Sequence, residues 1–122
     1  MSKNTNFKYK SDFTVEERLN ESTRIKNEYP TRVPIICEIA PNSKLPPLRK
    51  TKYLVPYDMT MNQFQFLIRR NMDLNQDSAL FLFTPSGKTF MGNKTMMEVY
   101  NNHKDKEDNF FYIYCDSEVT MG

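Results

Sequence analysis

The stretch Arg49-Lys50-Thr51-Lys52-Tyr53-Leu54-Val55-Pro56 begins basic, becomes apolar and ends at a proline. Tyr53, Leu54 and Val55 favour a pleated strand, and Pro56, which has no N–H, marks a strand end or an edge position. We therefore predict a strand at the edge of a sheet. An edge of this kind can accept another strand, although lysines on an edge strand also serve simply to discourage aggregation.

The charge around this predicted strand indicates which partner it would favour. No Asp or Glu lies between Ile39 and Tyr57, whereas the same segment holds Lys44, Arg49, Lys50 and Lys52. A peptide that pairs with this edge would therefore do better with acidic residues. Charge selection and protection against aggregation are equal alternatives on this pattern alone.

Length and composition limit the classes of protein. A chain of 122 residues suffices for one domain with its own core. The balance of 17 basic and 15 acidic residues is too even for nucleic acid to be the main partner.

Cys37 and Cys115 lie in apolar runs without metal-ligand spacing, so we expect reduced core thiols, no metal and no cofactor. The longest apolar run, Phe110 to Cys115, is too short to span a membrane, and we expect a cytoplasmic protein.

Signals in the first third of the chain predict a helix and a strand. Thr14-Val15-Glu16-Glu17 is a capping box, and Pro30 ends the segment that follows it. The expected inner face of this helix is a thin stripe of Val15, Leu19, Ser22, Ile25 and Tyr29. Residues 1–13 form either an arm or a short helix.

The segment Arg32 to Ile39 alternates as a strand with apolar residues on both faces. One face holds Val33, Ile35, Cys37 and Ile39, and the other holds Pro34, Ile36 and Glu38. We therefore expect the first helix to pack over Ile36, leaving a groove between helix and sheet.

The rest of the chain predicts a central helix and a buried strand. Thr60-Met61-Asn62-Gln63 is a second capping box, followed by a broad apolar face that should cover the other side of the sheet. A strand at 78–84, a short return strand at Thr89–Met91 and a helix capped by Asn93 follow. Phe110 to Cys115 is apolar on both faces, as is typical of an interior strand in a parallel sheet.

This order of elements predicts an α+β fold, the ubiquitin-like β-grasp with an additional N-terminal helical extension. We expect an N-terminal arm or short helix at 1–13, the β-grasp domain with its extra helix at 14–116, and a flexible C-terminal tail at 117–122. Fold alone does not give function.

Four groups of residues carry a resemblance to a known family: Tyr29-Pro30 with Arg32-Val33-Pro34, Lys52-Tyr53-Leu54-Val55-Pro56, Gln63-Phe64 with Leu67-Ile68-Arg69, and Tyr100 with His103-Lys104-Asp105. From about Phe7 to Gly122 the sequence resembles the autophagy ubiquitin-like modifiers, the family that includes the GABA-receptor-associated protein and the microtubule-associated light chain.

The resemblance implies conjugation and no enzyme activity of the chain itself. An activating and a conjugating enzyme would join Gly122 to the amine of phosphatidylethanolamine, and a delipidating cysteine protease would release it. The protein would then be cytoplasmic, and bound to the autophagosomal membrane when lipidated. Met121 departs from the Phe or Tyr usual in the family, which bears on how that protease grips the tail.

The resemblance also implies cargo receptors that carry a short motif, an aromatic residue followed three positions later by an aliphatic one. The first motif pocket would be lined by Glu21, Ile25, Pro34, Ile36, Lys52, Leu54 and Phe110. The second would use Tyr53, Val55, Pro56, Met59, Phe64, Leu67 and Ile68. The residues expected to attract an acidic flank are Arg32, Arg49, Lys50 and Arg69. For the apolar members, ordinary core is the competing interpretation.

Other classes remain as alternatives. An unconjugated β-grasp adaptor would tether cargo or cytoskeleton through the same pockets and tolerate Gly122→Ala. An enzyme would need Cys37 or Cys115 with His103 as base, which apolar strands disfavour because burial raises a thiol pKa. No nucleic acid partner is expected, since a charged patch is more often a solvated surface.

Overall fold

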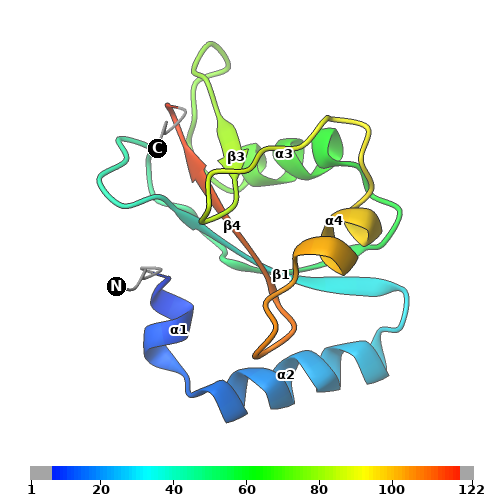
Figure 1. The fold of residues 1–122 in the computed structure, drawn as a ribbon. Helices are drawn as coiled ribbons and strands as arrows, with labels where there is room; N and C mark the ends of the chain where they lie inside the picture. Colours follow the sequence, from blue (N-terminus) through cyan, green and yellow to red (C-terminus); the bar gives the residue numbers. More distant parts are fainter. Residues whose placement is uncertain (1–6, 119–122) are drawn as a thin grey trace.

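The computed structural model describes residues 7–118 and places them in a mixed sheet with helices on both of its faces (Figure 1). The chain runs in the order α1 (Lys8–Asp12), α2 (Val15–Glu28), β1 (Arg32–Ile39), β2 (Lys52–Pro56), α3 (Met61–Arg70), β3 (Phe81–Phe83), α4 (Met96–His103) and β4 (Phe111–Asp116).

The four strands lie in the order β2-β1-β4-β3, which confirms that the Lys52 strand is at an edge. β1 pairs antiparallel with β2, with Pro34 opposite Leu54 and Ile36 opposite Lys52. β1 and β4 are the interior strands and run parallel, with Ile35 opposite Phe111. This is the predicted β-grasp arrangement.

Each face of the sheet has its own hydrophobic cluster. Phe64 and Ile68 of α3 pack with Val33, Ile35 and other residues of that face. On the opposite face, Ile25 of α2 packs with Ile36 and Phe110. Figure 1 shows α1 and α2 on one side of the strands and α3 and α4 on the other. The alternation of β1 therefore places the helices as predicted.

The predicted starts of α2 and α3 are confirmed, whereas the inner face of α2 differs from the prediction. Thr14 and Thr60 each cap a helix in a complete capping box, with Glu17 and Gln63 as their partners. The inner face of α2 is formed by Arg18, Ser22 and Ile25. Val15, Leu19 and Tyr29 were predicted for that face and are exposed. The face is rotated because Arg18 pairs with a buried carboxylate.

Two predictions between β3 and β4 were wrong. Thr89–Met91 forms no strand. Thr84 N donates to Lys88 O at 2.9 Å and closes a turn, and the chain after Met91 meets the first turn of α3, where Asn62 N donates to Gly92 O at 3.0 Å. The cap of α4 is Thr95, in a capping box with Glu98, and not Asn93.

The N-terminal segment is a docked helix. Phe7 is fully buried and stacks on Tyr114 with the ring centroids 4.2 Å apart. The Glu38 carboxylate accepts hydrogen bonds from the N–H groups of Lys8 (2.8 Å) and Tyr9 (3.0 Å), so it caps α1 from strand β1. Of the two alternatives for residues 1–13, a short helix is therefore correct for Lys8–Asp12.

Candidate functional site

The free edge of β2 presents backbone groups that have no partner strand within residues 7–118. Cys37 N donates to Thr51 O at 2.9 Å, and Tyr57 N donates to Thr31 O at 3.0 Å. In an antiparallel pair, hydrogen-bonded and non-hydrogen-bonded residues alternate. With this register, the N–H and C=O of Lys52 and Leu54 point away from β1, toward solvent. An added strand could pair with both residues.

On the α2 side of β2, the residues predicted for the first motif pocket come together. Ile25, Ile36 and Phe110 are fully buried, and Leu54 lies half-buried against them. Pro34 is buried opposite Leu54 in the strand register. Ile25, Ile36 and Phe110 therefore fit the interpretation as ordinary core, and Leu54 is the apolar member of this set with surface that a ligand could contact.

Two charged residues form the rim of this groove. Lys52 Nζ lies 2.7 Å from Glu21 Oε2 and so joins β2 to α2. Arg24 also binds Glu21, with its Nη2 2.9 Å from Oε2. These hydrogen bonds, first from Arg24 and then from Lys52, lower the pKa of Glu21 to about 2. Glu21 is therefore ionised at neutral pH, and it holds the Lys52 ammonium at the mouth of the groove.

On the α3 side, the residues predicted for the second motif pocket share one cluster but are mostly core. Tyr53, Val55, Phe64 and Ile68 are at most 3% exposed, which fits the competing interpretation for these four. The half-buried members are Pro56, Met59 and Leu67. Only these three have much surface that a ligand could contact.

The four residues predicted to attract acidic groups differ in the partners that they already have within the protein. Arg32 Nη1 donates to Leu54 O at 2.8 Å, so it lies at the free edge of β2. Lys50 is exposed, with its Nζ 5.2 Å from the centroid of the Tyr53 ring. Arg49 is paired with Asp73 at 3.0 Å. Arg69 is half-buried and donates to Asn75 O at 3.4 Å.

A buried ion pair that sequence reasoning missed holds Phe110 in the groove. Arg18 pairs with Asp108, which is fully buried and also accepts from the Tyr112 hydroxyl at 2.5 Å and from Phe110 N at 2.9 Å. Ser22 Oγ donates to Asp108 O at 2.5 Å. The network fixes α2 against the loop before β4. The partners are 90 residues apart, and no local pattern in the sequence marks such a pair.

A further pocket adjoins the N-terminal end of β2. Its lining includes Tyr9 and Phe13 from the N-terminal segment together with Leu48 and Thr51 from the chain before β2. The sequence predicted an arm or a short helix for residues 1–13, with no role in a site. Docking of α1 brings them beside the groove.

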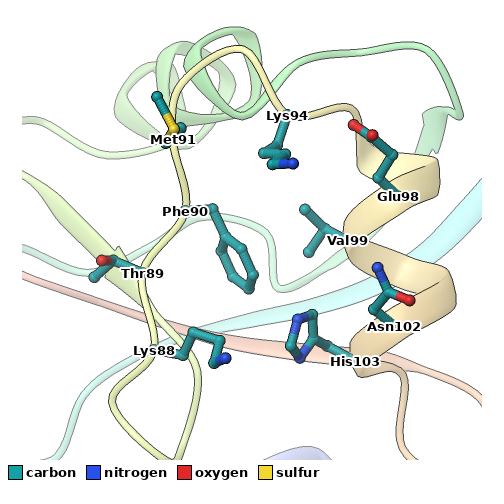
Figure 2. A pocket seen from close by; sticks show the side chains of 9 residues that line it. All are labelled: Lys88, Thr89, Phe90, Met91, Lys94, Glu98, Val99, Asn102 and His103. Carbon is teal, nitrogen blue, oxygen red and sulfur yellow. The ribbon is translucent and has the colours of Figure 1, made fainter.

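Figure 2 shows a different pocket, between α4 and the segment Lys88–Lys94. Phe90 and Val99 provide its apolar surface, and His103 lies beside the Phe90 ring with centroids 5.1 Å apart. Burial, and then the charge of Lys88, lower the pKa of His103. None of the residues lining this pocket belongs to the two predicted motif pockets.

The two cysteines that an enzyme would need lie in the core. Cys37 and Cys115 are fully buried free thiols, and burial raises the pKa of Cys37. Within residues 7–118, no group of three His, Cys, Asp or Glu side chains could hold a metal ion. The same part of the chain has no helix with the length and apolar character needed to cross a bilayer. Gly122 and Met121 lie outside the described residues.

Comparison with known proteins identifies the family. The family model described as "Autophagy protein Atg8 ubiquitin like" matches residues 17–122. The chain is 41% identical over 122 residues to Autophagy-related protein 8e of Arabidopsis thaliana, covering 100% of this chain and 97% of the relative. It is 40% identical over 118 residues to Autophagy-related protein 8D of Oryza sativa subsp. japonica, covering 93% and 96%.

A solved structure agrees. The crystal structure of Trypanosoma brucei ATG8 superposes with a TM-score of 0.86 at 35% identity, covering 97% of this chain and 100% of that one. The ubiquitin-like fold, the two-sided sheet and these relatives together show that the chain belongs to the Atg8 family of ubiquitin-like autophagy proteins.

Proposed function

We propose that this protein is a modifier that is conjugated to phosphatidylethanolamine through Gly122 and recruits proteins carrying an aromatic-x-x-aliphatic motif. The observation that carries the recruitment half is the free edge of β2, where Lys52 and Leu54 direct their backbone groups outward between two apolar surfaces. Family membership supports the conjugation half.

Strand addition explains how one short peptide could reach both surfaces. A peptide paired with Lys52 and Leu54 directs alternate side chains to opposite faces of the sheet. An aromatic side chain on the α2 face would contact Leu54, which packs on the cluster of Ile25 and Phe110. The aliphatic side chain would contact Met59 and Leu67 on the other face. Arg32, which now donates to Leu54 O, would release that carbonyl and become available to an acidic group.

Conjugation would follow from the chemistry of an unhindered terminal glycine. Its carboxylate attacks the α-phosphate of ATP on the activating enzyme, and pyrophosphate leaves. A cysteine thiolate of that enzyme displaces AMP, the acyl group passes to a thiol of the conjugating enzyme, and the lipid amine displaces that thiol to form an amide. The two acyl chains then anchor a protein whose own described helices cannot span the bilayer. The protein would divide between cytoplasm and autophagosomal membrane, with a delipidating protease reversing the bond.

Motif binding is tested with a labelled peptide that has acidic residues ahead of a Trp-x-x-Leu core. We expect Leu54→Ala to weaken binding by about tenfold, because the aromatic side chain loses its contact at the groove. Leu19→Ala, at an exposed leucine of α2, is the matched control and should bind normally. Equal affinity of the two variants for the peptide would contradict binding at Leu54.

Conjugation is tested separately, by intact mass after incubation with the activating and conjugating enzymes, ATP and phosphatidylethanolamine vesicles. Wild-type protein should gain the mass of the lipid less one water, located on Gly122 by fragmentation, and Gly122→Ala should remain unmodified while binding the peptide normally. Peptide binding with no lipid adduct on the wild-type protein would instead indicate an unconjugated adaptor.

A further inference from the structure

A pocket between α2 and α4 differs in character from the motif groove. It is lined on the α2 side by Thr23, Lys26 and Asn27, and on the α4 side by Asn101 and Lys104. Its volume is about 340 Å³. It opens on the other flank of α2 from Glu21 and Ile25, so none of its lining residues belongs to the predicted motif pockets.

The charge in this α2–α4 pocket is unbalanced. None of the described residues that line it is acidic, and neither Lys26 nor Lys104 forms an ion pair within the described part of the chain. The nearby carboxylate of Asp108 is fully buried and bound to Arg18. The pocket is therefore positive and open to an anion.

Both ammonium groups lie near the same aromatic ring. The Nζ atoms of Lys26 and Lys104 lie 5.0 and 5.5 Å from the centroid of Tyr100. Tyr100 is itself fixed, since its ring is buried and its hydroxyl donates to Asn109 O at 2.6 Å. Since both lysines line the same pocket, a doubly charged group bound there could accept hydrogen bonds from both side chains.

We propose that the α2–α4 pocket binds a phosphate monoester carried on a peptide, such as a phosphoserine side chain. Lys26 and Lys104 hold the phosphate oxygens, and Thr23 donates its hydroxyl. The volume exceeds that of a phosphate group alone, and the rest is lined by the amides of Asn27, Asn101 and Asn109. A carboxamide both donates and accepts, so these side chains can bind a peptide backbone.

A peptide suits this pocket better than a membrane surface. Its lining has no exposed large hydrophobic side chain that could insert between lipids. Its cationic part is confined to two lysines around one ring, whereas membrane adsorption relies on clusters of several basic residues. The inference is independent of motif binding at β2 and of conjugation, because it uses different residues.

The test follows the NMR signals of the protein during titration with a short alanine peptide that carries one phosphoserine. We expect saturable shifts at the side-chain amides of Asn27, Asn101 and Asn109. Lys26→Gln and Lys104→Gln should each weaken binding by about fivefold, the range for a partly exposed charge contact. Lys44→Gln, at an exposed lysine in the loop between β1 and β2, is the matched control.

Three results would overturn the proposal. The first is the absence of saturable shifts at the pocket, or equal shifts with the unphosphorylated serine peptide. The second is inorganic phosphate binding as tightly as the phosphopeptide, which would leave no role for the asparagine amides. The third is a response confined to vesicles of phosphatidylcholine and phosphatidylserine, which would make the pocket a lipid contact.

Discussion

At the scale of the residue, Asp108 positions the groove wall. Its carboxylate binds Arg18 of α2 and accepts from Phe110 N and the Tyr112 hydroxyl, while it is fully buried. An isolated buried carboxylate is very costly, so each of these partners is required. The side chain of Phe110 therefore stays in the buried cluster against which Leu54 packs.

We expect Arg18→Ala to lower the free energy of unfolding by about 3–5 kcal/mol, because Asp108 is left buried without its cation. Urea unfolding at pH 7 measures the change. Arg24→Ala is the control, at an arginine of the same helix whose side chain is 47% exposed, and it should cost about 1 kcal/mol or less. Similar losses for the two variants would contradict a structural role for the buried pair.

Glu21 predicts a dependence of stability on pH. Its pKa is lowered to about 2 by Arg24 and Lys52, so its ion pairs stabilise the fold above the ordinary glutamate pKa of 4.5 and are lost as the pH falls toward 2. We expect Glu21→Gln to cost about 1 kcal/mol at pH 7, a modest value because the partners are partly exposed, and nothing near pH 2. Urea unfolding at a series of pH values measures this. A cost that persists at pH 2 would mean that packing, and not charge, is involved.

At the scale of the element, α1 is held from outside by strand β1. Its five residues are too few for a stable isolated helix. The capping box at Thr14 belongs to α2 and does not stabilise α1. Phe7 supplies apolar anchoring, and Glu38 binds the first N–H groups of the helix. Without these contacts the pocket lined by Tyr9 and Phe13 would lose one wall.

We expect Glu38→Gln to undock α1 in part, because an amide offers one acceptor oxygen where the carboxylate offers two and carries no charge to complement the helix N-terminus. Backbone amides of α1, such as that of Ser11, should exchange with solvent about tenfold faster, while those of β1 keep their rates. Glu16→Gln in the first turn of α2 is the control. Unchanged exchange at Ser11 would show that Phe7 holds the helix unaided.

Sequence signals predicted elements best where they are local. Capping boxes placed the starts of α2 and α3, and alternation of Ile35 and Ile36 assigned the two faces of β1. The return strand at Thr89–Met91 failed because turn residues and an apolar pair resemble a hairpin. The chain just after it, at Gly92 and Lys94, instead accepts hydrogen bonds from the first turn of α3, a contact between distant segments.

At the scale of the whole molecule, the site depends on which element lies at the sheet edge. The edge position of β2 and the interior position of β4 were predictable, since β4 is apolar on both faces and β2 begins with a lysine and ends at a proline. The residues of the first motif pocket, around Leu54, could be predicted from the sequence only through the family resemblance. Arg18 with Asp108, and the Lys26 and Lys104 pair around Tyr100, join segments far apart in sequence and needed coordinates.

The central claim is that β2 accepts a strand, and hydrogen exchange at its backbone tests it most directly. Lys52 and Leu54 amides point to solvent, whereas Tyr53 and Val55 lie in hydrogen-bonded pairs with β1. In the free protein we expect fast exchange at Lys52 and Leu54 and slow exchange at Tyr53 and Val55. With the Trp-x-x-Leu peptide bound, Lys52 and Leu54 should become protected by about tenfold or more. Saturating peptide that leaves both amides as fast as before would contradict strand addition.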